Sequence, residues 1–201
     1  MQKSKKNEDL RVRKTRKLLQ NALMTLTIQE GFESVTVKEI CEHAMVNRTT
    51  FYRHYADKFD LLDQYMDNLY HLLDQPAGES GFDLPSAGLV RLLEHLRGHA
   101  DFYRAMLGPN GYPHFAERVR DYIKQRIQRS LPANLAPVDS DRPPLDMMLG
   151  YISSAGLGAI LWWLDNNMPV SAKQMAIWAT QLSSIDLNYA LGDDFLNLHT
   201  K

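Results

Sequence analysis

The chain has 201 residues, a length that suits one large domain or two smaller ones sharing a core. Apolar residues make up 44% of it and charged residues 23%, which is the ordinary balance of a soluble globular protein. Its one cysteine, Cys41, excludes an internal disulfide framework and indicates a reducing, cytoplasmic location. The N-terminus is basic but lacks the apolar segment of a secretory signal, so we expect no export.

The net charge of −1 hides a difference between the two parts of the chain. Residues 1–60 carry twelve Lys/Arg against eight Asp/Glu, whereas the remaining residues carry eleven against sixteen. Residues 1–17 alone hold eight basic residues and two acidic ones. A basic head on an acidic body predicts that only the head meets a polyanion. A merely solvated basic tail is the alternative, and charge runs are more often of that kind.

The head is predicted to contain three helices. Apolar residues at helical spacing indicate a first helix from Leu10 to Glu30, which Gly31 ends. Thr36 followed by Glu39 forms a capping box, which starts a second helix. A tight turn at Met45-Val46 then separates the second helix from the third.

The third helix is predicted from Arg48 to Tyr55, with Asn47 as its N-cap. Phe51 and Tyr55, four positions apart, share one side of this helix and are expected to point inward. Two short helices joined by a tight turn form a helix-turn-helix, whose second helix enters a DNA groove. The opposite side of the third helix is therefore expected to face DNA.

Candidate DNA-binding residues follow from this orientation. Arg48 stands at the N-terminal end of the third helix, and its guanidinium can bond O6 and N7 of guanine. Thr49 can bond a base or pack its methyl group against thymine. The remaining candidates are expected to contact phosphates and so to set the register without reading sequence; they are Thr36, Lys38, Thr50, Tyr52, His54 and Lys58. An ordinary charged surface helix is the alternative.

The stretch from Thr36 to Leu62 resembles the TetR/AcrR family of one-component bacterial regulators. Met45 stands where that family has a turn glycine, so we expect backbone strain or a different turn geometry there. Asn47 stands where serine is commoner, but it caps a helix equally well. The residues that match the family pattern are Thr36, Ile40, Ala44, Val46, Thr50, Phe51, Tyr52, His54, Lys58, Leu61 and Leu62.

The resemblance implies an all-α homodimer with a helix-turn-helix DNA-binding domain over residues 1–56. It also implies a larger helical domain over residues 57–201, which holds a ligand pocket and the dimer interface. Family members mostly repress transcription, and ligand binding spreads the two DNA-binding heads; a minority activate. The expected partners are a double-stranded DNA operator, a second copy of the chain and a small-molecule effector.

The body is predicted to be helical throughout, which brings the total to about nine helices. The expected helices cover residues 57–73, 85–97, 101–107, 113–131, 145–166 and 171–191, with connectors at 75–84 and 132–144. We find no internal repeat and no convincing strand pattern.

Residues 147–164 carry no charge, and a run of eighteen uncharged positions reaches the threshold for a membrane span. The run lacks a positive flank and is rich in small residues, so we expect a helix of the dimer interface and no membrane contact. The predicted interface residues are Ser153, Ser154, Gly156, Gly158 and Ala159.

Large and aromatic residues of the body are candidates for a ligand pocket, although core packing explains such residues as well. The candidates are Tyr103, Met106, Phe115, Met148, Tyr151, Ile152 and Trp162. His95 and His99, four positions apart, could hold a metal ion from one helix face, but no third ligand accompanies them, so we expect a solvated pair. No cofactor motif or catalytic constellation occurs, and we expect neither a cofactor nor an enzyme.

The sequence therefore predicts a ligand-responsive, dimeric DNA-binding transcriptional regulator, acting as a repressor on a near-palindromic operator. A transcriptional activator or a ligand-free co-regulator of the same fold remains the alternative. A helical interaction protein and a small helical metalloenzyme are the rivals from other classes.

Overall fold

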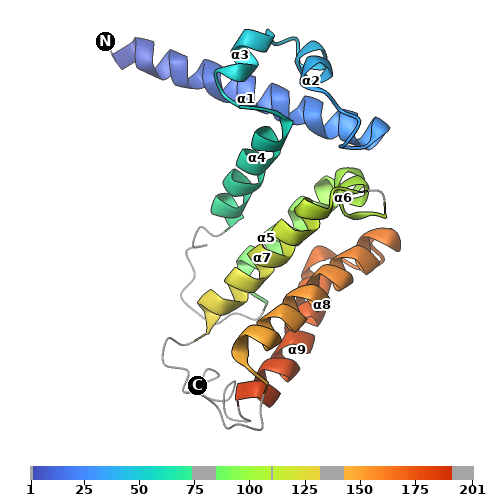
Figure 1. Ribbon diagram of the computed structural model, residues 1–201. Coiled ribbons are helices and arrows are strands. Elements are labelled where there is room, and N and C mark those ends of the chain that lie inside the picture. The colour runs from blue at the N-terminus through green and yellow to red at the C-terminus, as the bar shows by residue number, and fades with distance from the viewer. Residues whose placement is uncertain (1, 74–84, 110, 132–142, 192–201) are drawn as a thin grey trace. The chain divides into compact units, whose positions relative to one another are not determined.

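The computed structural model describes residues 2–73, 85–109, 111–131 and 143–191 (Figure 1). Within these ranges the chain forms nine α-helices and no strand, which confirms the predicted all-α fold. The predicted connector at 75–84 lies outside the described residues, as does most of the loop at 132–144.

The helices divide into two compact units. The first unit comprises Met1–Leu72 and Asp101–Tyr112, and the second comprises Leu73–Ala100 and Pro113–Lys201. A short piece of the middle of the chain thus packs with the N-terminal helices.

The helix-turn-helix part of the first unit consists of α1 (Gln2–Glu30), α2 (Val37–His43) and α3 (Arg48–Tyr52). Figure 1 shows α2 and α3 along one side of α1, and α2 contacts both of the other helices. The first helix begins eight residues earlier than predicted. The third ends earlier, although the amide of Tyr55 still donates to the carbonyl of Phe51 at 3.0 Å, as a continuing helix would.

Local capping explains where α2 and α3 begin. Thr36 is the N-cap of α2 and forms the predicted capping box with Glu39. Asn47 is the N-cap of α3, and its side-chain oxygen accepts a hydrogen bond from the amide of Thr49 at 2.8 Å. Each cap satisfies an amide that the first turn of a helix leaves without a partner.

The turn between α2 and α3 is left-handed at Met45, so of the two outcomes expected there, backbone strain or a different turn geometry, the structure shows the strained one. Met45 has a φ of +52°, and its side chain is 94% exposed. The Met45 amide donates to the backbone carbonyl of Glu42 at 3.2 Å, and the Val46 amide donates to the backbone carbonyl of Cys41 at 2.9 Å. These two bonds form a Schellman motif, in which glycine is the usual residue at the left-handed position. Gly31, with a φ of +81°, ends α1 in this usual way.

Two further helices complete the first unit, α4 (Lys58–Leu73) and α6 (Ala100–Leu107). The fourth helix buries Leu61, Leu62 and Met66. Phe102 of α6 packs edge-on against Tyr65 of α4, with ring centroids 6.3 Å apart. The core of the helix-turn-helix is therefore extended by a helix from the middle of the chain.

The second unit contains α5 (Ala87–Gly98), α7 (Pro113–Ser130), α8 (Leu145–Asp165) and α9 (Ala172–Leu191). The eighth helix packs along α7 and α9, and α9 also contacts α5. Ser171 caps α9 as predicted, since the Gln174 amide donates to its hydroxyl oxygen at 3.1 Å. The fully buried Trp163 donates its indole N–H to the Val170 carbonyl at 3.0 Å and fastens the turn between α8 and α9.

The boundaries of these two units differ from the predicted domain boundary at residue 56. The fourth helix stays with the head because its apolar side, which includes Leu61 and Leu62, is buried there. The sixth helix follows because Phe102 and Tyr103 are buried in the same unit. The assignment of DNA binding to residues 1–56 and of ligand binding and dimerisation to residues 57–201 stays a prediction.

The eighth helix is long and apolar enough to cross a membrane by length and composition. Nearly half of its apolar window is buried within the protein, and core helices of soluble proteins pass the same test. The helix is therefore weak evidence for a membrane span.

Candidate nucleic-acid interface

The third helix buries one aromatic side and leaves a polar side open. Phe51 is 0% exposed and Tyr55 is 2% exposed, so both point inward as predicted. Their ring centroids lie 5.6 Å apart, and this packing fixes the rotation of α3 about its axis. The exposed or half-buried residues of the other side are Arg48, Thr49, Thr50, Tyr52, Arg53 and His54.

Arg48 and Thr49 stand at the N-terminal end of this open side. Both side chains are exposed, and the Thr49 amide already has Asn47 as its partner. A free guanidinium at this position can form two parallel hydrogen bonds with a guanine edge, and a threonine can meet either a base or a thymine methyl. Their placement supports the base-reading role, which stays a prediction.

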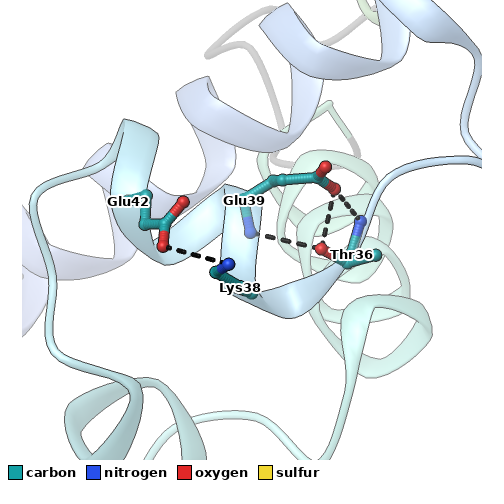
Figure 2. A network of polar contacts seen from close by, with 4 residues as sticks. All are labelled: Thr36, Lys38, Glu39 and Glu42. Atoms are coloured by element: carbon teal, nitrogen blue, oxygen red, sulfur yellow. Dashed lines mark hydrogen bonds and ion pairs between the residues drawn. The ribbon is translucent and has the colours of Figure 1, made fainter.

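Thr36 is committed to its capping box (Figure 2). Its hydroxyl donates to Oε2 of Glu39 at 2.7 Å, its amide donates to the same oxygen at 2.8 Å, and the Glu39 amide donates back to its hydroxyl oxygen at 3.3 Å. These bonds to Thr36 hold the pKa of the Glu39 carboxyl below its usual value. A phosphate contact by Thr36 would have to compete with this arrangement, so the residue's expected DNA contact is untested and the cap is its observed role.

Lys38 is held only loosely. Figure 2 shows its ammonium beside Glu42, one helical turn away, at an N–O distance of 3.9 Å. Both side chains are about two-thirds exposed, at 67% and 65%, and such ion pairs contribute little in water. Exchanging the Glu42 carboxylate for a phosphate therefore costs little, and Lys38 remains a candidate phosphate contact.

Lys58 does not point outward as the sequence predicts. Its Nζ donates to three backbone carbonyls of the loop between α1 and α2, those of Phe32 at 2.9 Å, Glu33 at 2.8 Å and Val35 at 2.9 Å. An ammonium carries three hydrogens, so all of its donors are used within the protein. The structure therefore corrects the predicted phosphate contact: Lys58 ties the start of α4 to that loop.

Aromatic rings surround the same ammonium. Its Nζ lies 4.9 Å from the ring centroid of Phe32 and 5.2 Å from that of Phe59. Tyr112 packs against both rings, with centroid distances of 4.9 and 5.6 Å. Sequence reasoning missed this role because the carbonyl partners lie 23 to 26 residues away and backbone atoms leave no sequence pattern.

Arg16 acts electrostatically at the C-terminal end of α3, and sequence reasoning missed this residue too. Burial is the main cause that lowers the pKa of His54, and the charges of Arg16 and Arg53 lower it further. Arg16 also acts on the phenol of Tyr55. Its charge is therefore near the C-terminal end of α3. A pKa below the usual 6.5 leaves the His54 imidazole neutral at pH 7, with one N–H to donate.

The residues predicted for the dimer interface divide between two sides of α8. Ser153 is 3% exposed, and its hydroxyl donates to the Gly150 carbonyl at 3.1 Å. A Cβ at Gly156 would lie 3.5 Å from the side chain of Ile123, so this position faces α7. The structure therefore buries Ser153 inside the second unit, contrary to the prediction, whereas the half-buried Gly156 stays a predicted interface residue.

The outward side of α8 carries aromatic residues instead. Tyr151 is 62% exposed and Trp162 is 48% exposed, so the structure corrects the prediction that both line a pocket inside the chain. On α9, Trp178 and Leu182 are 40% and 63% exposed. We call these four residues, together with the exposed residues aligned with them on α8, the apolar face; its α8 members are Met147, Tyr151, Ser154, Gly158 and Trp162. Of the residues predicted for the dimer interface, Ala159 is half-buried beside it.

The other residues predicted for the ligand pocket are buried, and they are Tyr103, Met106, Phe115, Met148 and Ile152. Tyr103 and Met106 belong to the first unit, and the other three belong to the second. Met148 and Ile152 pack with the half-buried Ile127, as core residues do. Both core packing and pocket lining produce such burial, so the pocket stays a prediction.

The pair of histidines on α5 is stacked. The ring centroids of His95 and His99 lie 4.3 Å apart, and Nδ1 of His99 lies 3.0 Å from the His95 carbonyl oxygen. Burial, and then the charge of His99, lowers the pKa of His95 to about 4. Within the part of the chain that the structure describes, no cluster of three or more His, Cys, Asp or Glu side chains suits a metal ion.

Comparison with known protein families identifies the family to which the chain belongs. The family of bacterial regulatory proteins of the tetR type matches residues 19–65, which include α2, α3 and their caps. A transcriptional regulator C-terminal region of the TetR type matches residues 83–184. The chain belongs to the TetR family. TetR-family proteins are DNA-binding transcriptional regulators and not enzymes, which confirms both predictions.

Curated relatives of this TetR-family regulator match it at modest sequence identity. YxbF, an uncharacterized HTH-type transcriptional regulator of Bacillus subtilis (strain 168), is 22% identical over 171 residues, which are 80% of this chain. This chain spans only about half the length of the curated relatives it matches, and 43% of YxbF.

Two solved structures resemble the regulator over most of its length. A TetR transcriptional regulator from Streptococcus agalactiae 2603V has a TM-score of 0.66 at 23% identity, covering 88% of this chain and 97% of that chain. The dihydroxyacetone kinase operon activator DhaS has a TM-score of 0.62 at 15% identity, covering 89% and 98%. At such low identity the likeness shows the fold alone.

Proposed function

We propose that this TetR-family protein is a dimeric, ligand-responsive repressor that binds a near-palindromic DNA operator. The observation that carries the proposal is the open polar side of α3. Its rotation is fixed by the buried ring of Phe51, and its first exposed residues are Arg48 and Thr49. Burying these donors against a partner without acceptors would cost free energy, whereas a DNA groove offers base edges and phosphates.

Dimerisation is supported by the apolar face. Exposing Tyr151 and Trp162 to water forfeits the hydrophobic gain of their burial, and a second copy of the same face supplies an apolar partner. Ser154 and Gly158 lie between these aromatic residues, and their small side chains let a facing helix approach closely. The support is the chemistry of the face and the packing of its two helices, α8 and α9, against each other.

A two-fold dimer would present two copies of α3. Recognition helices of such dimers enter successive major grooves on one side of the duplex, about 34–36 Å apart. The two half-sites of the operator would then be related by the same two-fold symmetry as the protein. We therefore expect an inverted repeat with half-site centres about one helical turn apart.

A small-molecule effector is the least directly supported part of the proposal. Buried polar groups in an apolar setting are typical of ligand sites, and a hydrogen bond joins the hydroxyls of Tyr65 and Tyr103. Burial raises the pKa of Tyr65 to about 12, so both phenols stay neutral donors and acceptors. An effector would change the spacing of the two DNA-binding heads only to the extent that it binds the protein more tightly at one spacing than at the other.

Activation is the alternative to repression. DhaS, which shares the fold, is described as an operon activator, so this fold is compatible with activation. A reporter gene placed downstream of the operator separates the two: deleting the regulator raises expression under repression and lowers it under activation. We further propose a cytoplasmic location, consistent with a DNA partner, and no membrane contact.

Selection of binding sites from a pool of random duplexes tests the proposal. We expect the enriched sequences to contain an inverted repeat, and we expect their affinity to fall linearly with the logarithm of salt concentration. Enrichment of nothing above the starting pool at low salt would contradict DNA binding. Enrichment of a single unrepeated half-site would contradict the dimeric arrangement.

A further inference from the structure

We propose that the N-terminal half of α1 is a second DNA-binding site, which holds phosphates beside the sequence read by α3. Its central residues are Arg13 and Arg16, and we call their side of the helix the basic face. The inference rests on the proposed DNA binding and extends it to a part of the chain that helix-turn-helix recognition does not require.

First, the N-terminal half of α1 extends beyond the packed core of its unit. The helix begins at Gln2, but its first buried side chain is Leu19, and the described side chains from Leu10 to Leu18 are exposed or half-buried. At 1.5 Å per residue, the helix extends about 25 Å before it reaches the core. Most helices in proteins owe their stability to a packed face, so a long segment with little packing is suited to a partner outside the chain.

The second step is charge. Residues 1–17 hold eight Lys/Arg and two Asp/Glu, the densest positive charge of the sequence. Within the part with described side chains, Arg11, Arg13, Lys14, Arg16 and Lys17 are all exposed. Double-stranded DNA presents one negative charge per about 1.7 Å of its axis, which matches a cationic helix of this kind.

The third step is position. Arg16 lies close enough to the C-terminal end of α3 to act electrostatically on His54 and Tyr55, and Arg53 acts on His54 as well. Both helices belong to the first unit, and α2 contacts each of them (Figure 1). The acid that acts on Tyr55 is Asp60, whose carboxylate accepts hydrogen bonds from the Ala56 amide and the Gln64 side chain.

From this position the basic face continues the open side of α3. A duplex seated on α3 carries its phosphates past the C-terminal end of that helix, where the charges of Arg16 and Arg53 both act on His54. Phosphates there would neutralise cations that otherwise repel one another. We therefore assign the basic face to the backbone that flanks each half-site, where contacts add affinity without reading bases.

The register of α1 supplies a matched control. Arg13 and Arg16 are three residues apart and share one side of the helix. Arg11 and Lys14 are also three apart, but a shift of two residues turns the helix by about 200°, to nearly the opposite side. The variants Arg13→Ala/Arg16→Ala and Arg11→Ala/Lys14→Ala therefore remove the same charge from opposite sides.

The experiment measures affinity against salt concentration for both double variants of the full chain. The DNA is the selected operator, once with ten flanking base pairs on each side and once trimmed to the repeat. For Arg13→Ala/Arg16→Ala we expect the salt slope on the flanked operator to fall by about two per subunit and the affinity gain from the flanks to disappear. For Arg11→Ala/Lys14→Ala we expect the slope and the gain of the unchanged chain.

A third variant, Arg13→Lys/Arg16→Lys, keeps the charge and should keep the slope, which separates a phosphate contact from loss of helix structure. Equal effects of the two alanine pairs, or no effect of either, would overturn the inference while leaving the operator binding of the unchanged chain intact. Absence of salt-dependent DNA binding by the unchanged chain would instead overturn the proposed function, and the inference with it.

Discussion

The exposed side of α3 and the apolar face of α8 and α9 carry opposite chemistry. The first is a short surface of cations and hydroxyls, held in place by the buried Phe51. The second is a long surface of aromatic and small residues, in which Trp162 is about half exposed. Charged donors lose free energy when they are buried without acceptors, whereas aromatic rings gain it when they leave water. Each face therefore selects its own class of partner.

The largest expected effect comes from placing a charge on the apolar face. In Trp162→Asp, the carboxylate would be buried twice in a two-fold interface, so the dissociation constant of the dimer should rise by at least about 100-fold. Sedimentation equilibrium measures it. The control is Ile28→Asp, at a residue of α1 that is similarly exposed, 47% against 48%. An unchanged dimer for Trp162→Asp would show that the apolar face is not the interface.

The next effect tests whether every cation of the head belongs to the DNA-binding surface. Lys58→Met keeps the stem but leaves three carbonyls without their charged donor, so the free energy of unfolding should drop by about 2–3 kcal/mol. Lys38→Met, which removes only the loose ion pair, should cost less than about 0.5 kcal/mol. Urea unfolding measures both.

The salt dependence of DNA binding separates the two possible roles of Lys58. We expect the slope to be unchanged in Lys58→Met, because its ammonium is already bound to carbonyls. A slope reduced by about one, with stability intact, would return Lys58 to the phosphate contacts.

The base-reading role of the open polar side of α3 can be tested at single operator positions. Arg48→Ala should lower affinity for the selected operator by about 1–3 kcal/mol and relax the preference at one position of each half-site. Binding to the operator and to its single-base variants, measured at one salt concentration, checks both expectations. Equal losses on operator and random DNA would mean that Arg48 does not read bases.

The smallest effect concerns the turn before α3. Met45→Gly removes the Cβ from a left-handed residue, which relieves about 1–2 kcal/mol of backbone strain. Part of this gain is lost because glycine makes the unfolded chain more flexible. The free energy of unfolding should rise by about 0.5–1 kcal/mol. Met45→Ala should change little, because it keeps the Cβ and the side chain is exposed. Equal stability of the two variants would show that the turn is unstrained.

The sequence predicts those parts of the fold that depend on neighbouring residues. The capping box of Thr36 and Glu39 and the cap at Asn47 both follow from contacts within a few positions. The inward side of α3 follows from the spacing of two aromatic residues. All of these are confirmed because local geometry is set by local chemistry.

The sequence fails where the answer depends on distant contacts. The carbonyl partners of Lys58 lie in a separate loop, and the charge that acts on His54 comes from α1. The eighth helix is apolar on nearly every side, so its periodicity does not tell which residues face outward. For this reason the sequence predicts Ser153 at the dimer interface and Tyr151 in a ligand pocket, whereas the structure buries the first and exposes the second.

The most direct test of the account compares one operator with half of it. The unchanged protein should bind the full inverted repeat at least about 100-fold more tightly than a duplex of equal length that carries a single half-site, because the dimer engages both copies of α3 at once. Equal affinities for the two duplexes, measured at the same salt concentration, would contradict the paired docking on which the account depends.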